Sequence, residues 1–453
     1  FLSSFRMSYL DLISDAINAG GLPSYNDYQG KIDYKPSQHH NFTILGISGN
    51  SVYERSKTDA MDASEDSYGR VDNNQYTLGL NYLLVINKKA YSKTSVSFSD
   101  QMSKIKFFDI SSDSLLNGIN DEYLTHHLRN ANYISLNNKF NIVAGFELLN
   151  RNLKYDFKLN DITVKDNISF QNISTFLNLK ALLLSNLTIS SGLRIQKSDF
   201  EKTFKTSPRI NLDYRLPGGM GNIILNSGKY FQNPPEKYLA LANQGNARSV
   251  YATQNSISYE KLITESTRLT LSLYEKYYGN APIIISDFDR FTSPAFLMDK
   301  NLTFSDIDFD GRAESKGAEF LIEKKRAQNF YGHVGGSIYN STYIDYMGVE
   351  RNRDSNYKYT FNAVGGYRPS DKWELSLRWS LFGGKPYTEA DVESSLQTDR
   401  AVYLTQEYNE SRTPAYHNLF LRYEYRKVYR SHNIIGYIEL WNAYNRKNVE
   451  NYS

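Results

Sequence analysis

The sequence WELSLRWSL, from Trp373 to Leu381, decides the fold of this protein. Apolar side chains occupy its odd positions and polar side chains its even positions, and a tryptophan begins the apolar series. Side chains of a β-strand point to its two faces in turn, so one face of this strand is apolar and the other can line water. A wall with one apolar and one aqueous side predicts a β-barrel that stands in a membrane.

Other segments repeat this alternation. Between residues 267 and 278, Leu269, Leu271 and Leu273 alternate with polar residues. Between residues 177 and 196, the alternation keeps its parity across the turn at Ser185 and Asn186. A slip of one residue would move every leucine to the lumen, so the turn length fixes the register. A charge on the apolar face near the midplane would cost about 2 to 4 kcal/mol for Arg or Lys.

Short and long polar connections alternate along the chain. The short ones are residues 35–41, 87–90, 137–141, 184–186, 217–221, 262–266, 325–329, 368–372 and 426–432. The long ones are near residues 13–24, 55–69, 109–127, 157–168, 197–205, 232–250, 279–312, 345–356 and 383–413. Transmembrane barrels have short turns at the periplasmic rim and long loops outside, so the long connections are expected at the cell surface.

The segments between these connections predict nineteen strands. They are residues 2–12, 25–35, 42–54, 70–86, 91–108, 128–137, 141–156, 169–183, 187–196, 206–216, 222–231, 250–261, 267–278, 313–324, 330–344, 357–367, 373–382, 414–425 and 433–443. One more strand after them and two before them would make twenty-two, as in the large plugged transporters. The opening residues after Phe1 carry no secretory signal. We therefore expect residues 1–453 to form one barrel domain that is incomplete at both ends.

The composition permits this fold and excludes other classes. No apolar run approaches the roughly 18 residues of a spanning helix, while 14% of the residues are aromatic and the mean hydropathy is -0.55. A net charge of +3 is too balanced for a protein that binds nucleic acid through a basic face. The absence of cysteine rules out a disulfide scaffold and a thiolate metal site.

Several local patterns resemble the barrel of TonB-dependent outer-membrane receptors. They are the Ser-x-Arg-x-Ser-Tyr-Leu-Asp segment at residues 4–11, Gly228 to Pro235 in the middle of the barrel, Ser315 to Phe320, the Gly-Lys-Pro-Tyr-Thr loop at residues 384–388, residues 408–417 in the last outer loop and Asn442 to Asn448. These patterns follow the order of the family from residue 4 to residue 448. The sequence departs from it at Asn418-Leu419-Phe420, where the family often has Arg-Leu-Asp, so no role is assigned to that aspartate.

The resemblance implies a plug domain and a TonB-recruiting segment, neither of which lies in this sequence. It implies a multi-pass protein of the Gram-negative outer membrane with outer-membrane lipid and the TonB complex as partners. A surface lipoprotein or a larger envelope assembly is a further predicted partner. It also implies a receptor that imports a scarce ligand, without an enzymatic reaction and without a cofactor.

Candidate ligand-binding residues are aromatic or polar side chains placed where outward strands meet the longest loops. They are Tyr230, Phe231, Gln232, Tyr238, Tyr387, Tyr403, Arg412 and Tyr416. Aromatic rings there could stack on a ligand, and an arginine could bind a carboxylate or a phosphate. The alternative for each residue is an aromatic girdle or loop packing.

Metal and catalytic sites are poorly supported by the sequence. Asp306, Asp308, Asp310 and Gly311 copy the opening of a calcium loop, but Gly317 stands where the bidentate glutamate should be. The adjacent histidines His39-His40 and His126-His127 would point to opposite faces of an extended segment. The seven histidines are scattered, and no Gly-x-Ser-x-Gly motif occurs.

Polar residues on the lumen side of the strands are expected to form ion pairs or contact a plug. They are Arg194, Arg268, Glu319, Glu323 and Arg378. The pairs Gly335-Gly336 and Gly365-Gly366 are expected to permit barrel curvature or the close approach of a plug backbone. The alternatives to an importer are a structural or export component of the envelope, a passive porin, and a soluble all-β protein.

Overall fold

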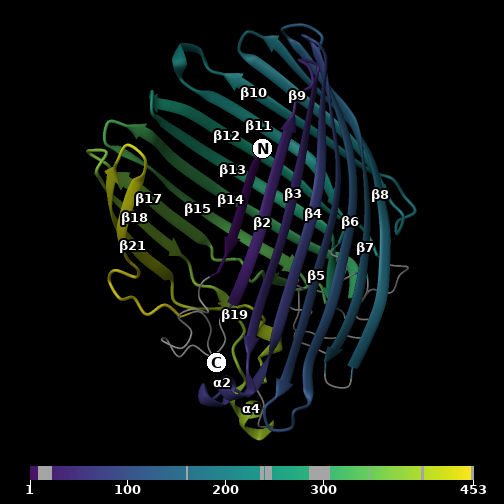
Figure 1. Cartoon of the computed structure of the whole chain (residues 1–453), viewed down its shortest axis with the longest axis vertical. Helices are drawn as coiled ribbons and strands as arrows, with labels where there is room; N and C mark the ends of the chain where they lie inside the picture. Colours follow the sequence, from purple (N-terminus) through teal and green to yellow (C-terminus); the bar gives the residue numbers. More distant parts are fainter. Residues whose placement is uncertain are drawn as a thin grey trace.

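The protein is a long antiparallel sheet that curves around a hollow (Figure 1). The computed structural model describes residues 1–8, 23–159, 162–234, 239, 247–284, 307–345, 347–398 and 402–449. No helix among these residues is long and apolar enough to cross a membrane.

Each of the nineteen predicted spans coincides with a strand. They are β1 (Leu2–Met7), β2 (Pro23–Tyr34), β3 (His40–Arg55), β4 (Ser67–Asn87), β5 (Ala90–Asp109), β6 (Leu115–Ser135), β7 (Phe140–Leu159), β8 (Ile162–Leu184), β9 (Leu187–Ser198), β10 (Lys205–Arg215), β11 (Asn222–Gln232), β12 (Val250–Thr264), β13 (Thr267–Ile284), β14 (Ile307–Ala327), β15 (Phe330–Ile344), β17 (Tyr359–Tyr367), β18 (Trp373–Phe382), β21 (Tyr416–Val428) and β22 (Asn433–Leu440). Each pairs with the strands that precede and follow it in this series, and β1 and β22 each pair with one strand among the described residues.

Short elements occupy the long connections. They include α2 (Lys57–Asp62), β16 (Glu350–Asn352), β19 (Pro386–Tyr387), α4 (Val392–Thr398) and β20 (Ser411–Arg412). The labels α2, α4 and β19 gather at one end of the barrel in Figure 1, and the tight turns lie at the other end. This arrangement confirms that the short and long connections sort to opposite rims.

The tight turns depend on local backbone chemistry. In the turn between β10 and β11, Gly218, Gly219 and Gly221 have φ angles of 64°, 70° and 105°. Glycine adopts such angles most readily, so the chain reverses tightly between Arg215 and Asn222, which pair with each other. The length of the turn therefore sets the register of β11 against β10, so that the apolar side chains of both strands share one face.

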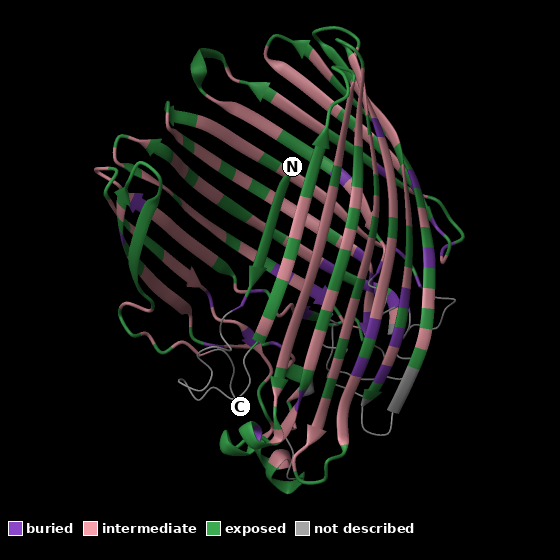
Figure 2. Cartoon of the chain, viewed as in Figure 1, coloured by how far each residue is buried: buried purple, intermediate pink, exposed green. Residues whose placement is uncertain are grey.

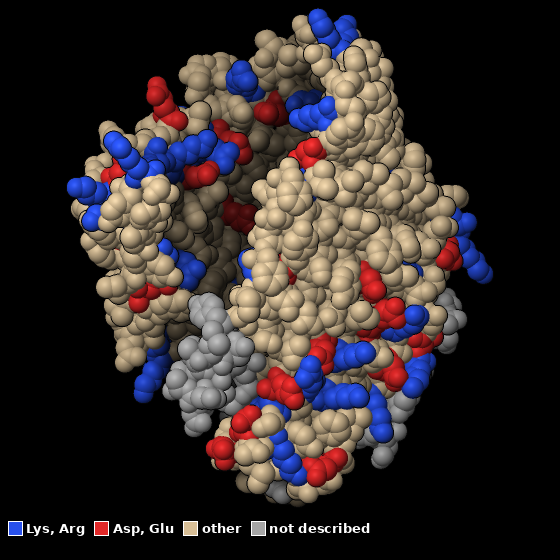
Figure 3. Space-filling model, viewed as in Figure 1, with Lys and Arg blue, Asp and Glu red and all other residues tan. Residues whose placement is uncertain are grey.

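The lipid-facing side of the wall is apolar. In β18 the odd positions, Leu375 and Leu377 among them, share their face with Tyr423 and Leu421 of β21. These four side chains are exposed, as befits a surface that meets lipid. Figure 3 shows the corresponding uncharged zone on the front wall, with charged residues gathered below it over the outer ends of β3 to β7.

The predicted loops near residues 109–127 and 157–168 are wrong, because β6 begins at Leu115 and β7 continues to Leu159. The two faces of β7 exchange character beyond Asn150. Towards the inner rim, Ile142 and Phe146 face outward, whereas beyond Asn150 the same face carries Lys154 and Asp156. The sequence of this part is polar like a loop because its outward face stands in water.

The opposite face of the same strands supplies the core. Ile119 of β6 packs with three side chains of β7, Leu153, Tyr155 and Phe157, and Leu153 is fully buried. A second cluster at the outer end joins Phe170, Leu239, Ala247 and Phe309. Figure 2 shows buried positions towards the outer ends of the long strands, so the apolar core lies in the outer part of the barrel.

The loop predicted near residues 279–312 is also shorter than expected. β13 continues to Ile284 and β14 begins at Ile307, and residues 285–306 lie outside the described part of the chain. Ala281 and Ile283 of the extended β13 are buried. The strands therefore continue past the membrane because their inner faces are covered by the outer-end core.

Candidate functional site

Arg412 joins two long loops at the outer rim. Its Nη1 donates to the carbonyl oxygen of Asn356 and, over 3.1 Å, to that of Gly384, and its Nη2 donates over 3.3 Å to Oδ1 of Asn352. Burial lowers the pKa of Arg412, but its ordinary value is so high that the guanidinium stays charged. A half-buried cation held by carbonyl dipoles thus clamps the loop after β15 to the loop after β18.

Asparagine side chains extend this clamp. Asn409 donates over 3.0 Å to the carbonyl oxygen of Asn352 and over 2.7 Å to Asp354, while Asn352 donates over 3.0 Å to the carbonyl oxygen of Asn409. Asn356 is fully buried and donates over 3.0 Å to Asn340 of β15. These bonds pair backbone carbonyl oxygens and side-chain amides that the packing of the loops removes from water, whereas Oδ1 of Asn356 has no hydrogen-bond partner among the described residues.

Two adjacent glycines allow the loops to approach each other. A Cβ atom on Gly383 would lie 1.9 Å from the carbonyl oxygen of Tyr357, and one on Gly384 would lie 1.9 Å from that of Thr413. No side chain fits there. The Gly-Lys-Pro-Tyr-Thr pattern therefore begins with a residue that the packing of the clamp requires.

A cavity of about 500 Å³ opens beside the clamp. Its lining is Tyr357, Phe382, Gly383, Lys385, Thr413, Tyr416 and Val449. The ring of Tyr416 lies 5.8 Å from that of Phe382, measured between centroids. Aromatic surface, a lysine and a threonine hydroxyl around one hollow can bind a ligand with both apolar and anionic parts.

The structure brings four predicted residues into one neighbourhood. Tyr387 and Arg412 lie on β19 and β20, which pair with each other, and Tyr416 begins β21. Tyr403 forms a bridge with Ala390 in the same loop and is half exposed. Arg412 has its donors engaged by the loops, whereas Tyr403 and Tyr416 offer surface.

Three of the other four predicted residues end β11. Tyr230 and Gln232 share the lumen face, and the ring of Tyr230 lies 4.6 Å from the guanidinium of Arg209. Phe231 points to the opposite face, where its ring lies 5.8 Å from that of Tyr251. Alternation thus separates Phe231 from its two neighbours. Tyr238 lies outside the described residues.

Ion pairs cross the lumen face, as expected there. Arg194 donates over 2.9 Å to Glu147, which also lies 3.0 Å from Nε2 of His127. Arg268 donates over 2.8 Å to Glu323.

Another predicted lumen residue, Arg378, lies over the ring of Phe420 at 4.0 Å. A network that the sequence does not reveal links Arg422 and Arg426 to Glu424, and Arg426 also to Glu374 of β18. Arg422, Glu424 and Arg426 share one face of β21, and the strand register brings Glu374 of β18 beside them.

The structure gives no support to the metal-site alternatives within the described residues. No group of three His, Asp or Glu side chains there could hold a metal ion. Asp310 pairs with Arg248 over 2.9 Å, and Asp306 lies outside the described part. His126 and His127 point to opposite faces of β6, as predicted.

Comparison with known proteins agrees with this geometry. A family model described as "TonB dependent receptor-like, beta-barrel" matches residues 5–434. No curated protein matches the sequence. Solved structures match at low sequence identity, and at such identities the likeness shows the fold alone.

The copper transporter OprC superposes with a TM-score of 0.69 at 11% identity, over 94% of this chain and 67% of its own. The ferripyoverdine receptor of the Pseudomonas aeruginosa outer membrane gives 0.72 at 11% identity, over 94% and 62%. The ferric citrate transporter FecA gives 0.68 at 12%, over 95% and 66%. The chain thus spans about two thirds of each of these proteins. Because the family model covers nearly the whole chain, this protein belongs to the TonB-dependent receptor β-barrel family, whose members reside in the outer membrane.

Proposed function

We propose that this receptor imports a scarce small ligand across the outer membrane with energy delivered through TonB. The family supports this function, and the single structural observation that carries it is a polar, ion-paired lumen inside an apolar wall, with a lined cavity at its outer mouth. A route of this kind serves passage of a solute rather than covalent chemistry.

The ligand would first meet the outer rim. Tyr416, Tyr403 and Tyr387 supply aromatic and hydroxyl surface near the clamp, and Tyr230 and Gln232 supply it across β11. Arg412 would act chiefly by holding the loops, since its donors already have protein acceptors. The remaining contacts would come from the apices of an N-terminal plug, and TonB pulling on that plug would open the lumen.

The structurally similar transporters suggest a class of ligand. These neighbours are a copper transporter, a ferric citrate transporter and a ferripyoverdine receptor. On the lumen face Arg209 lies against the ring of Tyr230, which favours an anionic ligand such as a metal chelate. A passive porin and a structural or export component are the alternatives, and a lipoprotein partner stays a prediction.

The test is uptake of a radiolabelled ligand chosen from copper ions, ferric citrate and a ferric hydroxamate-type chelate. We expect binding at the cell surface to persist, and accumulation to stop, when TonB is deleted or a protonophore is added. Accumulation that continues without TonB would overturn import by this mechanism and favour a passive porin. If no ligand class binds, and if deletion of the receptor gene nevertheless damages the cell envelope, the protein would be a structural component.

A further inference from the structure

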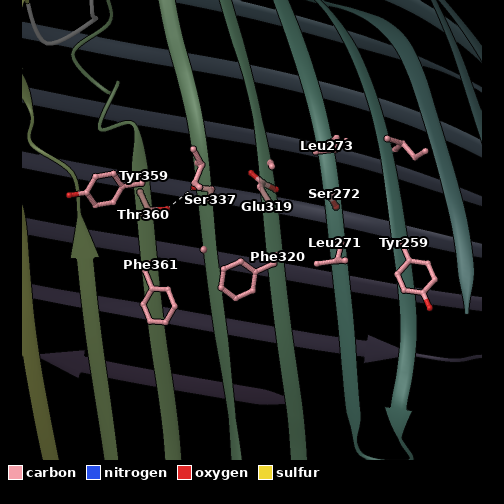
Figure 4. A pocket seen from close by; sticks show the side chains of 14 residues that line it. Tyr259, Leu271, Ser272, Leu273, Glu319, Phe320, Ser337, Tyr359, Thr360 and Phe361 are labelled. Atoms are coloured by element: carbon pink, nitrogen blue, oxygen red, sulfur yellow. Dashed lines mark hydrogen bonds between the residues drawn. The ribbon is translucent and has the colours of Figure 1, made fainter.

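A groove of about 750 Å³ lies on the outward face of the wall, away from the lumen. It crosses β12 to β17, and its floor is formed by the small residues Ala318 and Gly336. Larger side chains stand around the floor, and Figure 4 shows Tyr259, Leu271, Phe320 and Phe361 on four of these strands. A volume of this size is within the roughly 300 to 1,000 Å³ of ligand pockets.

The groove belongs to the membrane-facing belt. Two rows of cross-strand partners form it: Ile257, Leu273, Ala318, Ile338 and Tyr359 in one row, and Tyr259, Leu271, Phe320, Gly336 and Phe361 in the next. Ile338 is 73% exposed and Leu273 is 59% exposed. Such apolar exposure on a barrel wall in the outer membrane is covered by acyl chains, so the groove continues an existing lipid interface.

A polar row lies directly beyond the apolar rows, towards the outer rim. Its members are Ser227, Asn255, Glu275, Lys316 and Asn340, each the cross-strand partner of the next. Ser227 donates over 2.7 Å to Asn255, and Asn255 donates over 2.9 Å to Glu275. A second row follows with Lys229, Thr253, Tyr277, Glu314 and Thr342.

The depth of these rows matches the outer boundary of the membrane. Glu275 is eight residues beyond Thr267, where β13 begins at the inner rim, and a spanning strand needs about 9 to 11 residues. Charges on a lipid-facing wall become less unfavourable as they approach this boundary. The polar rows therefore stand at the level of the headgroups of the outer leaflet, above a groove at the level of its chains.

The charges of the two rows cancel. The rows carry two lysines, Lys229 and Lys316, and two glutamates, Glu275 and Glu314, and Lys316 lies 2.8 Å from Glu314. A balanced patch does not select a phosphate by net charge, since that would need an excess of cations. Amide, hydroxyl and phenol groups between the charges are suited to hydrogen-bond a headgroup rich in hydroxyls.

We propose that this surface binds a glycolipid of the outer leaflet, with an acyl chain in the groove over Ala318 and Gly336 and the sugar headgroup on the rows around Asn255 and Glu275. The site is independent of the import function, because it lies on the opposite face of the wall from the lumen. It fixes one lipid against the strands that lead to the loops after β13 and β15.

Native mass spectrometry of the full-length receptor tests the proposal. The receptor is reconstituted in bilayer discs of phosphatidylethanolamine, with or without a diacyl glucosamine glycolipid, and then delipidated in mild detergent. Ala318→Phe fills the groove, and Ala144→Phe is the matched control on the lipid-facing side of β7. We expect Ala318→Phe to lower glycolipid retention about tenfold, which corresponds to about 1.4 kcal/mol, while Ala144→Phe retains it.

A second pair of variants tests the headgroup contacts. Asn255→Ala and Glu275→Ala should lower retention of glycolipid but leave that of phosphatidylethanolamine unchanged, whereas Asn150→Ala on β7 should change neither. Equal glycolipid retention by wild type and Ala318→Phe would overturn the proposal, as would retention of phosphatidylethanolamine alone. If the wild type binds no lipid but forms a dimer, and Ala318→Phe abolishes this dimer, the groove would instead be the binding site for a second copy of the receptor.

Discussion

Nη1 of Arg412 donates to the carbonyl oxygen of Asn356, which lies 56 residues earlier in the sequence. The bond joins the loop between β15 and β17 to the loop between β18 and β21. Arg412→Met would leave buried carbonyl oxygens without a donor, at about 2 to 4 kcal/mol for several bonds to a charged group. We expect limited proteolysis of the loop at residues 383–413 to accelerate, and Arg412→Lys to restore only part of the protection. Unchanged proteolysis in both variants would show that the loops hold together without the clamp.

The two faces of β18 should respond oppositely to charge. Leu377→Arg places a cation against lipid and should lower the free energy of unfolding by about 2 to 4 kcal/mol, whereas Ser376→Arg faces the lumen and should change it by less than about 1 kcal/mol. Urea titration of barrels folded into lipid vesicles measures both. Equal losses at both positions would contradict the assignment of the two faces.

The ion pair between Arg194 and Glu147 should contribute more than that between Arg268 and Glu323. The side chains of the first pair are 26% and 22% exposed, and those of the second are 47% and 39% exposed. We expect Arg194→Met to lower the free energy of unfolding by about 1 to 3 kcal/mol and Arg268→Met by less than about 1 kcal/mol. Urea titration of the two variants checks this order.

Rim topology can be tested with single cysteines, because the sequence contains none. Met347 lies in the loop after β15 and Met220 in the turn after β10, and their side chains are 61% and 51% exposed. On intact cells, a membrane-impermeant maleimide should label Met347→Cys but label Met220→Cys only after lysis. The reverse labelling pattern would show that the barrel has the opposite orientation in the membrane.

Acid should leave one outer turn intact to an unusually low pH. Hydrogen bonds from Ser111 and Ser112 lower the pKa of Asp109 from 3.8 to about 2. Because the folded pKa is depressed, the contribution of this carboxylate is fully present above about pH 4 and is lost as the pH falls through about 2. Carboxyl-carbon NMR of the labelled receptor should give a midpoint near 2, and Ser112→Ala should raise it towards 3.8.

The sequence predicted the strands well because a two-residue period survives in every span. The prediction failed where a strand continues beyond the membrane, because its outward face is polar there. The start of β6, predicted as a loop, carries Asn120 and Glu122 on its outward face, and the polarity that marks a loop elsewhere marks a strand in water here. A prediction from polarity alone cannot separate the two, whereas the inward residues Ile119 and Tyr123 were the signal that could have done so.

The candidate site was predictable in position and not in contacts. Tyr230 and Gln232 lie at the predicted rim, but no local pattern shows that Arg412 binds the carbonyl oxygens of Gly384 and Asn356. Likewise, Ser227, Asn255 and Glu275 are separated by turns and loops, and they form one row only through the strand register. Interactions between distant segments depend on the pairing register of the strands and the packing of the loops, which a single sequence does not display.

The exchange of faces at Asn150 also sets the height of the rim. Nine residues of β7 remain between Asn150 and Leu159, and at a rise of about 3.3 Å per residue along a strand tilted by about 40° they climb roughly 23 Å. β18 instead ends at Phe382, one residue after its last lipid-facing leucine. The strands of the wall are therefore unequal in height, and the strands at β5 to β8 reach further outward than those at β17 and β18. Beside the shorter strands, the outer rim consists of the loop that carries β19, α4 and β20, so a solute arriving from the cell surface meets a wall of strands on one side and a folded loop on the other (Figure 1).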